Sequence, residues 1–482
     1  MDARLVAEFA GICGPAGVLH EPLELLTYEC DGLSHLRASP SLVVLPSSAS
    51  QVQAVVRLCN REGIPFVARG HGTGLSGGAL PVPGGIVVAL SRLNRVLAVD
   101  IANRRVTVEP GVTNLDITKA VAAHGYYYAP DPSSQQVCSI GGNIAENSGG
   151  AHCLKYGFTV HHVLALDVVL PDGELVHIGS PLADAPGPDL VGLFVGSEGT
   201  LGIATKIVVR ILRKPESVQT LLAAFDSIDA AGGAVSAIIG GGIIPAAVEM
   251  MDALAIRAAE AAVQPGFPVA ETILIVELDG PAAEVRTLFG VVEETCRQQG
   301  ATTVEIARDE QHRARIWRGR KAAFAAMGRV SPNYYVQDGV VPRTRLPEVL
   351  ARIRRLEARS GLRIGNVFHA GDGNLHPLIC YDERVPGEAD RAAEVAGEIL
   401  LYCVEAGGSI TGEHGVGADK AGSMPKMFTD DDLDVMQAVR AAFDPRRLSN
   451  PGKVFPTPRM CGEVPGPYHQ HPVEQAGLAE RF

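Results

Sequence analysis

Two histidines flank a glycine-containing turn in residues 366–376, Asn-Val-Phe-His-Ala-Gly-Asp-Gly-Asn-Leu-His, and this spacing strongly constrains the fold. The Asp372-Gly373 pair predicts a two-residue hairpin, because the primed turns that join two strands need positive φ angles. With that turn His369 faces His376, and directly opposed residues share a sheet face with Cβ atoms roughly 5 Å apart. Two imidazoles placed in this way could bind one divalent metal ion. The alternative interpretation is a pair of polar residues on an exposed hairpin.

A third metal ligand is available in Gly412-Glu413-His414-Gly415. Neutral imidazoles together with a carboxylate suit Zn²⁺, Mn²⁺ or Fe²⁺, and three protein ligands leave open positions for a substrate. His369, His376 and Glu413 therefore form the candidate metal site.

Charge and composition exclude several classes of function. The 482 residues carry a net charge of −12, which argues against nucleic acid as a partner because phosphate binding needs a basic surface. No apolar run is long enough for a transmembrane segment, and residues 1–4 lack the profile of a secretion signal. A cytoplasmic location is the default expectation, with membrane association through a partner as its variant. The nine cysteines include no Cys-x-x-Cys pair, so the next electron centre is expected on another chain.

The alternation of short strands and helices predicts an α+β protein with two main domains. The long stretch 230–262 is rich in alanine and is expected to be helical. The expected segments are a helical lead-in (1–39), a first domain (40–214), a second domain of helices on a sheet (215–425), a C-terminal segment that returns to the first domain (426–456) and a loose tail (457–482).

The first glycine-rich loop, 69–78, follows a predicted strand and contains Gly70, Gly72 and Gly74. Its spacing is not that of a Rossmann fingerprint, and the glycines and prolines that follow prevent a helix from starting there. Backbone N–H groups of such a loop can still surround a pyrophosphate. A plain surface loop is the alternative.

The second loop, 130–150, reads Pro-Asp-Pro-Ser-Ser and then Ser-Ile-Gly-Gly-Asn-Ile-Ala-Glu-Asn-Ser-Gly-Gly. Here the chain resembles the vanillyl-alcohol oxidase superfamily of flavoproteins, and within it the group of the glycolate oxidase D-subunit and D-lactate dehydrogenases. Further matching motifs lie at 195–203, 368–376, 408–420 and 444–456. The resemblance implies a two-part FAD-binding domain of the vanillyl-alcohol oxidase type plus an α+β substrate (cap) domain.

The resemblance also implies non-covalent FAD, because Thr73 takes the place of a histidine that some relatives bond to the cofactor. The residues expected to hold FAD are Arg69, Gly70, His71, Gly72, Thr73, Gly74, Ser76, Pro130, Asp131, Ser134, Gly141, Gly142, Asn143, Ala145, Asn147, Glu198, Ile203 and Asn450.

By the same resemblance, His369, His376 and Glu413 bind a divalent metal, His414 is the general base and Arg320 binds the substrate carboxylate. A metal lowers the pKa of a bound hydroxyl, so that a histidine can take its proton while hydride leaves for flavin N5. Gln337 stands where relatives that use dicarboxylates have lysine. A short 2-hydroxy acid of the glycolate or D-lactate type is therefore the expected substrate, and a 2-oxo acid the product.

Two other functions remain open at this point. One is a metal-independent FAD alcohol oxidase of the same fold, and the other is a non-catalytic flavin subunit of an electron-transfer complex. The resemblance implies a second flavin subunit and an iron–sulfur subunit as partners, while the electron acceptor stays undetermined.

Overall fold

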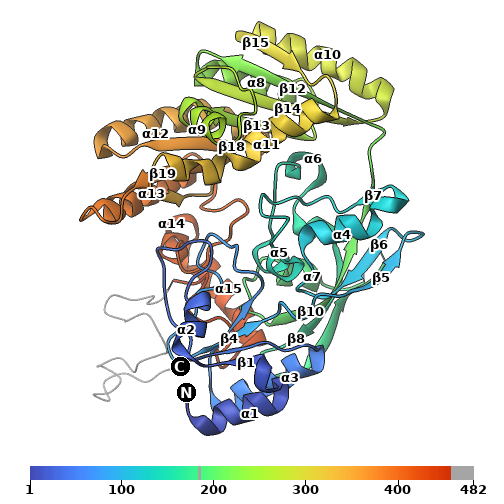
Figure 1. Ribbon diagram of the computed structural model, residues 1–482, viewed down its shortest axis with the longest axis vertical. Helices are drawn as coiled ribbons and strands as arrows, with labels where there is room; N and C mark the ends of the chain where they lie inside the picture. The colour runs from blue at the N-terminus through green and yellow to red at the C-terminus, as the bar shows by residue number, and fades with distance from the viewer. Residues whose placement is uncertain (183–185, 457–482) are drawn as a thin grey trace.

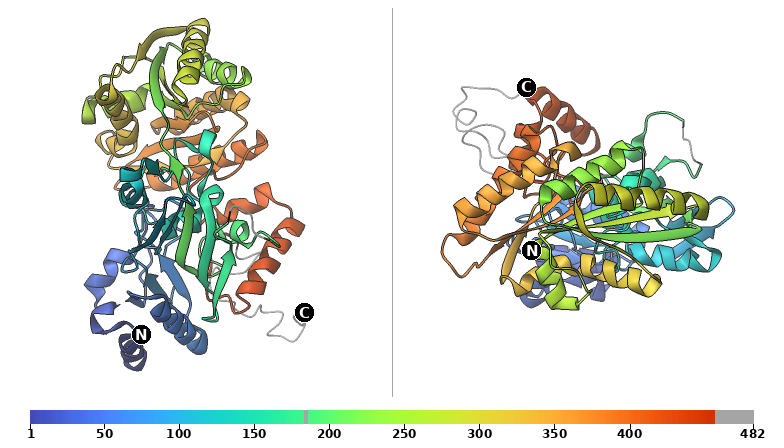
Figure 2. Two further views of the ribbon diagram at one scale, coloured as in Figure 1. Left: turned by 90° about the vertical axis from the view of Figure 1, so that its right-hand side faces the viewer. Right: turned by 90° about the horizontal axis from the view of Figure 1, so that it is seen from above.

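The computed structural model describes residues 1–182 and 186–456, so the expected loose tail lies outside the described residues. Two lobes are stacked along the longest axis of the molecule (Figures 1 and 2). The chain builds the lower lobe first and crosses to the upper lobe after strand β11 (Leu212–Arg213). It returns with helices α14 (Met424–Met427) and α15 (Asp430–Phe443).

The lower lobe contains two larger sheets with different strand directions, besides the two-stranded pair of β7 (Tyr126–Tyr127) and β11. In the first, β2 (Leu42–Val44), β4 (Ile86–Ala89) and β3 (Phe66–Arg69) run parallel, and helix α3 (Ala49–Glu62) connects β2 to β3. Ser48 caps α3 by accepting a hydrogen bond from the Gln51 N–H, and Gly63 ends it in the left-handed region at φ 68°. In sheet order, the strands of this first sheet are β1 (Val18–Leu19), β2 (Leu42–Val44), β4 (Ile86–Ala89) and β3 (Phe66–Arg69).

The second sheet of the lower lobe is antiparallel and packs against α4 (Asn114–Val121) and α5 (Ile140–Glu146). Ile117, Ile140 and Ile144 from these helices join its apolar core. In sheet order its strands are β5 (Val96–Asp100), β6 (Arg105–Val108), β10 (Ile203–Arg210), β8 (Val163–Val169) and β9 (Leu175–Gly179).

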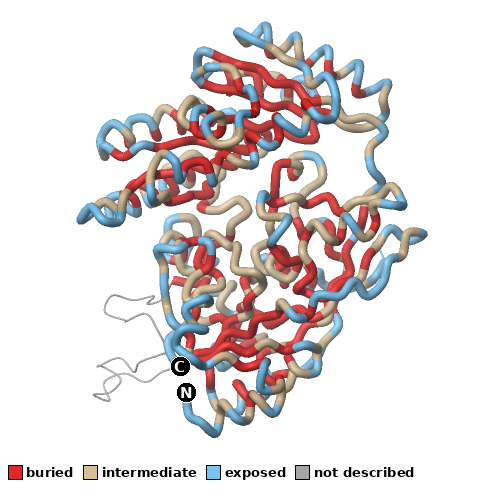
Figure 3. Tube along the Cα trace, viewed as in Figure 1, coloured by how far each residue is buried: buried red, intermediate tan, exposed pale blue. Residues whose placement is uncertain are grey.

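One large antiparallel sheet forms the upper lobe, with helices on both faces (Figure 3). Alternation along each strand divides its side chains between two apolar clusters. Its strands are β15 (Ala301–Ile306), β12 (Ser217–Phe225), β14 (Thr272–Gly280), β13 (Ala247–Asp252), β18 (Ile364–His369), β19 (Asn374–Tyr381), β16 (Asn333–Val336) and β17 (Gly339–Val340).

Side chains of alternating strand residues decide which helices each face contacts. In β14, Leu274 and Val276 pack with α8 (Ile228–Gly240), α10 (Ala282–Gln298), α12 (Leu346–Ser360) and α13 (Glu388–Glu405). Ile273 and Ile275 point the opposite way and pack with α9 (Ala253–Val263) and α11 (Glu310–Ala326). The candidate metal ligand His369 lies on the face toward α9 and α11, as do Val367 and Met251.

The prediction of helix throughout 230–262 is wrong. Helix α8 ends at Gly240, strand β13 follows, and α9 begins after Asp252, whose side chain accepts a hydrogen bond from the Ala255 N–H. Gly242, at φ 85°, takes a backbone conformation that ends the helix. The high alanine content of this stretch predicts helix, but strand β13 forms there because it pairs with β14 and with the distant β18.

The predicted two-residue hairpin is also wrong, although its two histidines do share a sheet face. His369 pairs with Asn374 and Val367 with His376, so the loop has four residues, 370–373. Of Asp372 and Gly373, Gly373 alone has a positive φ, and its backbone oxygen accepts a hydrogen bond from the Val341 N–H. The hydrogen bond from the Val341 N–H to Gly373 therefore helps to determine the conformation of this four-residue loop. A shift of two residues keeps every side chain on its original face.

Within residues 1–182 and 186–456, no helix is both long and apolar enough to cross a membrane.

Candidate active site

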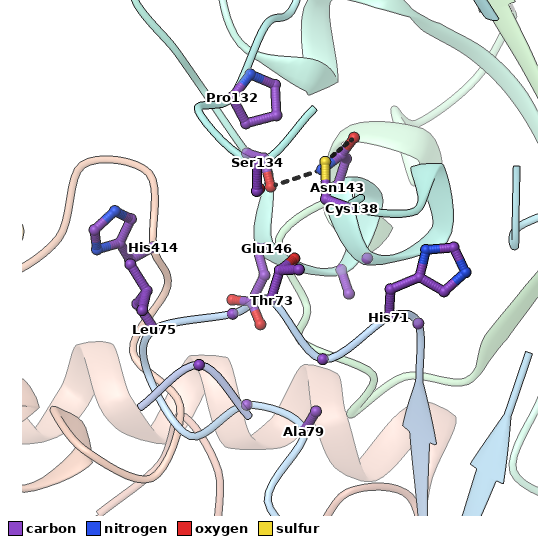
Figure 4. Close-up of a pocket in the computed structure, with 18 of the residues that line it drawn as sticks. His71, Thr73, Leu75, Ala79, Pro132, Ser134, Cys138, Asn143, Glu146 and His414 are labelled. Carbon is purple, nitrogen blue, oxygen red and sulfur yellow. Dashed lines mark hydrogen bonds between the residues drawn. The ribbon is translucent and has the colours of Figure 1, made fainter. Parts of the chain in front are cut away.

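A cavity of about 560 Å³ extends from the two glycine-rich loops of the lower lobe to the upper lobe (Figure 4). His71 lies at one side of it, Asn143 and Glu146 along it, and His414 at the opposite side. Its size falls in the range of ligand-binding pockets.

Close backbone contacts explain the glycines of both loops. A Cβ atom on Gly70 would lie 2.2 Å from the Ser139 Oγ, and one on Gly141 would lie 2.7 Å from the Pro110 Cβ. Gly72 has φ 69°, and a Cβ there would meet the Arg69 guanidinium at 2.1 Å. The first loop thus packs closely on Ser139 at the start of α5, and the missing Cβ atoms leave a narrow cradle lined by main chain, which suits a phosphate-bearing cofactor such as FAD.

Most of the residues predicted to hold FAD line this cavity. Those that do are Arg69, Gly70, His71, Gly72, Thr73, Gly74, Ser134, Gly141, Gly142, Asn143, Ala145, Glu198 and Ile203.

Five predicted cofactor residues do not line the cavity and instead support its walls. Asn450, at φ 45°, donates from its side chain to the Gly78 and Glu198 carbonyls. Asp131 binds His152, and Asn147 accepts from the Val160 N–H. The Pro130 carbonyl accepts from Asn114, and the Ser76 carbonyl accepts from the Asp419 N–H.

Several cavity residues were missed by the sequence analysis. The segment 32–35, expected to be part of a helical lead-in, lines the cavity, and the rings of His35 and Tyr335 are tilted by 40° with centroids 4.6 Å apart. Lys321 and Phe324 line it from α11. Their spacing of three residues on a helix is a local signal that could have identified them as one face.

The predicted metal ligands converge on the α11 side of the upper sheet. The Nε2 atoms of His369 and His376 each lie 3.3 Å from the Glu413 Oε1. The ligand atoms of the three residues all lie within 4.8 Å of one another. Both ring nitrogens of His376 and the Glu413 Oε2 are buried without a hydrogen-bond partner in the structure. Buried polar atoms that lack partners are costly, and a divalent cation would satisfy the His376 Nε2, which faces Glu413, and the Glu413 Oε2.

Asp338 fixes the loop that carries Glu413 and His414. Its Oδ2 accepts hydrogen bonds from the backbone N–H groups of Gly412 at 3.0 Å and His414 at 2.8 Å, and from the Thr411 hydroxyl. Burial favours the neutral acid, but the nearby Lys420 outweighs it and holds the pKa of Asp338 well below its usual range. The loop is therefore anchored by an ionised carboxylate.

His414 stacks on His376, with ring centroids 4.8 Å apart and an angle of 15° between the rings. Burial lowers the pKa of His414 to about 4, so the ring is a neutral acceptor at neutral pH. Its Nδ1 has no hydrogen-bond partner. A neutral, unpartnered imidazole at the end of the cavity can accept a proton from a ligand there.

Arg320 is buried behind this wall, and it does not line the cavity. Its Nε donates to the Glu249 Oε2 at 2.7 Å, while its Nη2 makes no aligned hydrogen bond. The guanidinium lies 6.0 Å from the centre of the Phe324 ring. The structure thus shows an arginine beside the candidate metal site that already has an acidic partner.

Two family models match the chain. "FAD binding domain" covers residues 40–179, and "FAD linked oxidases, C-terminal domain" covers residues 214–454. The glycolate oxidase subunit GlcD of Escherichia coli K12 is 52% identical over 94% of this chain and 91% of its own length. The subunit of the same name from Bacillus subtilis is 39% identical over 92% and 95%. A probable mitochondrial D-lactate dehydrogenase of Danio rerio is 32% identical over 94% and 92%.

Solved structures agree on the fold. A 4-ethylphenol oxidase from Gulosibacter chungangensis superimposes with a TM-score of 0.79 at 20% identity, covering 94% of this chain and 97% of its own. A p-cresol methylhydroxylase gives a TM-score of 0.79 at 18% identity, covering 94% and 96%. The protein described here belongs to the FAD-linked oxidases, with an FAD-binding domain of the vanillyl-alcohol oxidase type.

Proposed function

We propose that this enzyme oxidises a short 2-hydroxy acid, of the glycolate or D-lactate type, to the 2-oxo acid. The observation that carries the proposal is the meeting of the His369–His376–Glu413 cluster and His414 with the cavity lined by the two glycine-rich loops. The names of the relatives, glycolate oxidase subunit and D-lactate dehydrogenase, support the same class of substrate.

Each part of the site has a role in this chemistry. Non-covalently bound FAD supplies the electron acceptor, and a divalent cation held by His369, His376 and Glu413 supplies charge that acidifies a hydroxyl group. His414 accepts the hydroxyl proton on a ring nitrogen. Although Arg320 lies behind the cavity wall, we propose that it donates to the substrate carboxylate with the guanidinium hydrogens that Glu249 leaves free.

The preference for a monocarboxylate rests on Gln337, which is neutral where relatives that use dicarboxylates have lysine; it is 2% exposed and follows Val336, a residue of the cavity lining. A second carboxylate near Gln337 would lose its water shell without gaining a cation. Glycolate and D-lactate, which have no second carboxylate, avoid this cost.

Anaerobic mixing of the FAD-loaded enzyme with a panel of D- and L-2-hydroxy acids tests the proposal. We expect rapid loss of the oxidised flavin absorbance with glycolate or D-lactate, and loss of that response after metal is removed with a chelator. Full activity of the metal-free enzyme would instead favour a metal-independent alcohol oxidase. No flavin reduction by any hydroxy acid would favour a non-catalytic flavin subunit.

The partners of this enzyme are part of the proposal. We propose a second flavin subunit and an iron–sulfur subunit, because the bacterial relatives are named as subunits and the sequence has no Cys-x-x-Cys pair. Co-expression with its genomic neighbours followed by affinity purification tests this. Isolation of the chain alone as a fully active enzyme with a cytochrome or oxygen would contradict it.

A further inference from the structure

We propose that Glu249 is a positioning residue that holds His369 for metal binding and Arg320 for the substrate carboxylate at the same time. The roles of His369 and Arg320 in this proposal rest on the proposed function.

The backbone places Glu249 next to the metal site. Strands β13 and β18 are antiparallel neighbours (Figure 1). Glu249 is the residue directly opposite His369. Directly opposed side chains lie on the same face of a sheet and contact each other. Ala247 and Met251, two residues to either side of Glu249, pack in the cluster beneath α9 and α11, so this face is the one toward α11.

The Glu249 carboxylate contacts His369 and Arg320 at the same time. The His369 Nδ1 lies 2.8 Å from Oε1 and 3.0 Å from Oε2 of Glu249, and the Arg320 Nε donates to Oε2 at 2.7 Å. An ionised carboxylate is an acceptor only, so Nδ1 of His369 must carry the proton that it shares with Glu249. The Nε2 atom is thereby directed at Glu413, where the metal ligands converge.

Burial makes this arrangement rigid. Glu249 is 0% exposed and Arg320 is 2% exposed, so each charge depends on the other for compensation. On α11, Ile316, Arg320 and Ala323 form the inward face, which fixes the direction from which the guanidinium reaches Glu249. A change at Glu249 therefore alters both the orientation of His369 and the direction of the remaining Arg320 donors.

The neighbouring strand provides a matched control. Glu277 on β14 is 1% exposed and accepts from the Arg313 Nε at 2.8 Å and Nη2 at 2.9 Å. Arg313 lies two helical turns before Arg320 on α11. This second glutamate–arginine pair, in which the glutamate alone is buried, contacts none of His369, His376 and Glu413 among the interactions of the described residues. Glu277 also accepts from the Trp317 Nε1 at 2.7 Å and lies 3.2 Å from the His152 Nε2, so Glu277→Gln removes a buried charge from the same sheet without changing a contact of the metal ligands.

The experiment measures metal affinity of the metal-free protein by competition with a chromogenic chelator, for wild type, Glu249→Gln and Glu277→Gln. Both variants are expected to lower the melting temperature, because Glu249→Gln leaves the buried Arg320 without its counter-charge and Glu277→Gln removes the buried charge that Arg313 and His152 face. Glu249→Gln is expected to weaken metal binding about 10- to 100-fold, as loss of a carboxylate behind a ligating histidine typically does, while Glu277→Gln binds metal as the wild type does. Equal metal affinity in all three, or equal loss in both variants, would overturn the proposal.

A second variant covers the case in which Glu249→Gln does not fold. Glu249→Asp keeps the charge but shortens the reach, so an intermediate loss of metal affinity is expected, with KM for the hydroxy acid raised more than kcat is lowered. Unchanged metal affinity and unchanged KM in Glu249→Asp would contradict the proposal. A wild type that binds no divalent metal overturns this inference and the metal role together. A wild type that binds metal but oxidises no 2-hydroxy acid overturns the proposed function alone.

Discussion

The His152 Nε2 lies 3.2 Å from the Glu277 Oε1, and this contact joins the lower lobe to the upper lobe. On its other side the His152 Nδ1 lies 2.9 Å from the Asp131 Oδ2, and the ring stacks on Trp317 at 5.6 Å. Burial alone would lower the pKa of His152, but Asp131 and Glu277 outweigh it and raise the pKa to about 10. Asp131, expected to hold the cofactor, thus acts at the contact between the lobes.

The first prediction concerns the pH dependence of stability. The pKa of His152 is higher in the folded than in the unfolded chain, so its contribution is fully present below about pH 6.5 and is lost as pH rises toward 10. At pH 6 we expect His152→Gln to lower the free energy of unfolding by about 3 kcal/mol, and the difference from wild type should shrink by pH 10. Urea unfolding at several pH values measures it. His177→Gln, at an exposed pair with Asp167 within the lower lobe, is the control and should show no such trend.

The second prediction concerns His414. Replacing it with glutamine removes the proton acceptor at the end of the cavity but leaves the metal ligands and the glycine loops intact. We expect the rate of flavin reduction by substrate to fall about 10²- to 10⁴-fold, with FAD content and metal content unchanged. Stopped-flow absorbance together with metal analysis provides the measurement. A variant that reduces flavin at the wild-type rate would exclude His414 as the base.

The third prediction concerns His376, which is 1% exposed and has no hydrogen-bond partner for either ring nitrogen. Since Phe324 packs against its ring, His376→Phe keeps an aromatic side chain at the site while removing both candidate ligand atoms. Metal content should fall below one tenth of the wild-type value, while FAD binding is retained. Retention of stoichiometric metal in this variant would rule out His376 as a ligand.

The features that the sequence predicts best are those that depend on residues close together in the chain. The glycine loops were found because their composition signals a close backbone approach, and His369 and His376 were placed on one face although the register was two residues off. That error was harmless because side chains alternate along a strand with a period of two.

Long-range pairing was beyond prediction from the sequence. Glu249 is 120 residues from His369 in the chain and lies on a strand that alanine-rich sequence concealed. The segment 32–35 carries no local pattern that marks it as part of the cavity wall. In both cases the position depends on which strands and loops become neighbours, and that depends on the packing of the whole lobe rather than on local preference.

The last prediction tests the cradle formed by the glycine loops. Gly141 has no unusual backbone angle, but a Cβ there would lie 2.7 Å from the Pro110 Cβ and 3.0 Å from the Pro110 carbonyl oxygen. Because backbone cannot move away easily, Gly141→Ala should displace the loop, cost about 2 kcal/mol of stability and raise the FAD dissociation constant about tenfold or more. Flavin fluorescence titration and thermal unfolding measure the two effects. Gly290→Ala serves as the control, since it lies on the exposed side of α10 with no atom within 4 Å of its Cβ position. That substitution should leave FAD affinity unchanged and stabilise the helix slightly, so equal FAD affinity in Gly141→Ala and Gly290→Ala would show that the cradle does not hold the cofactor.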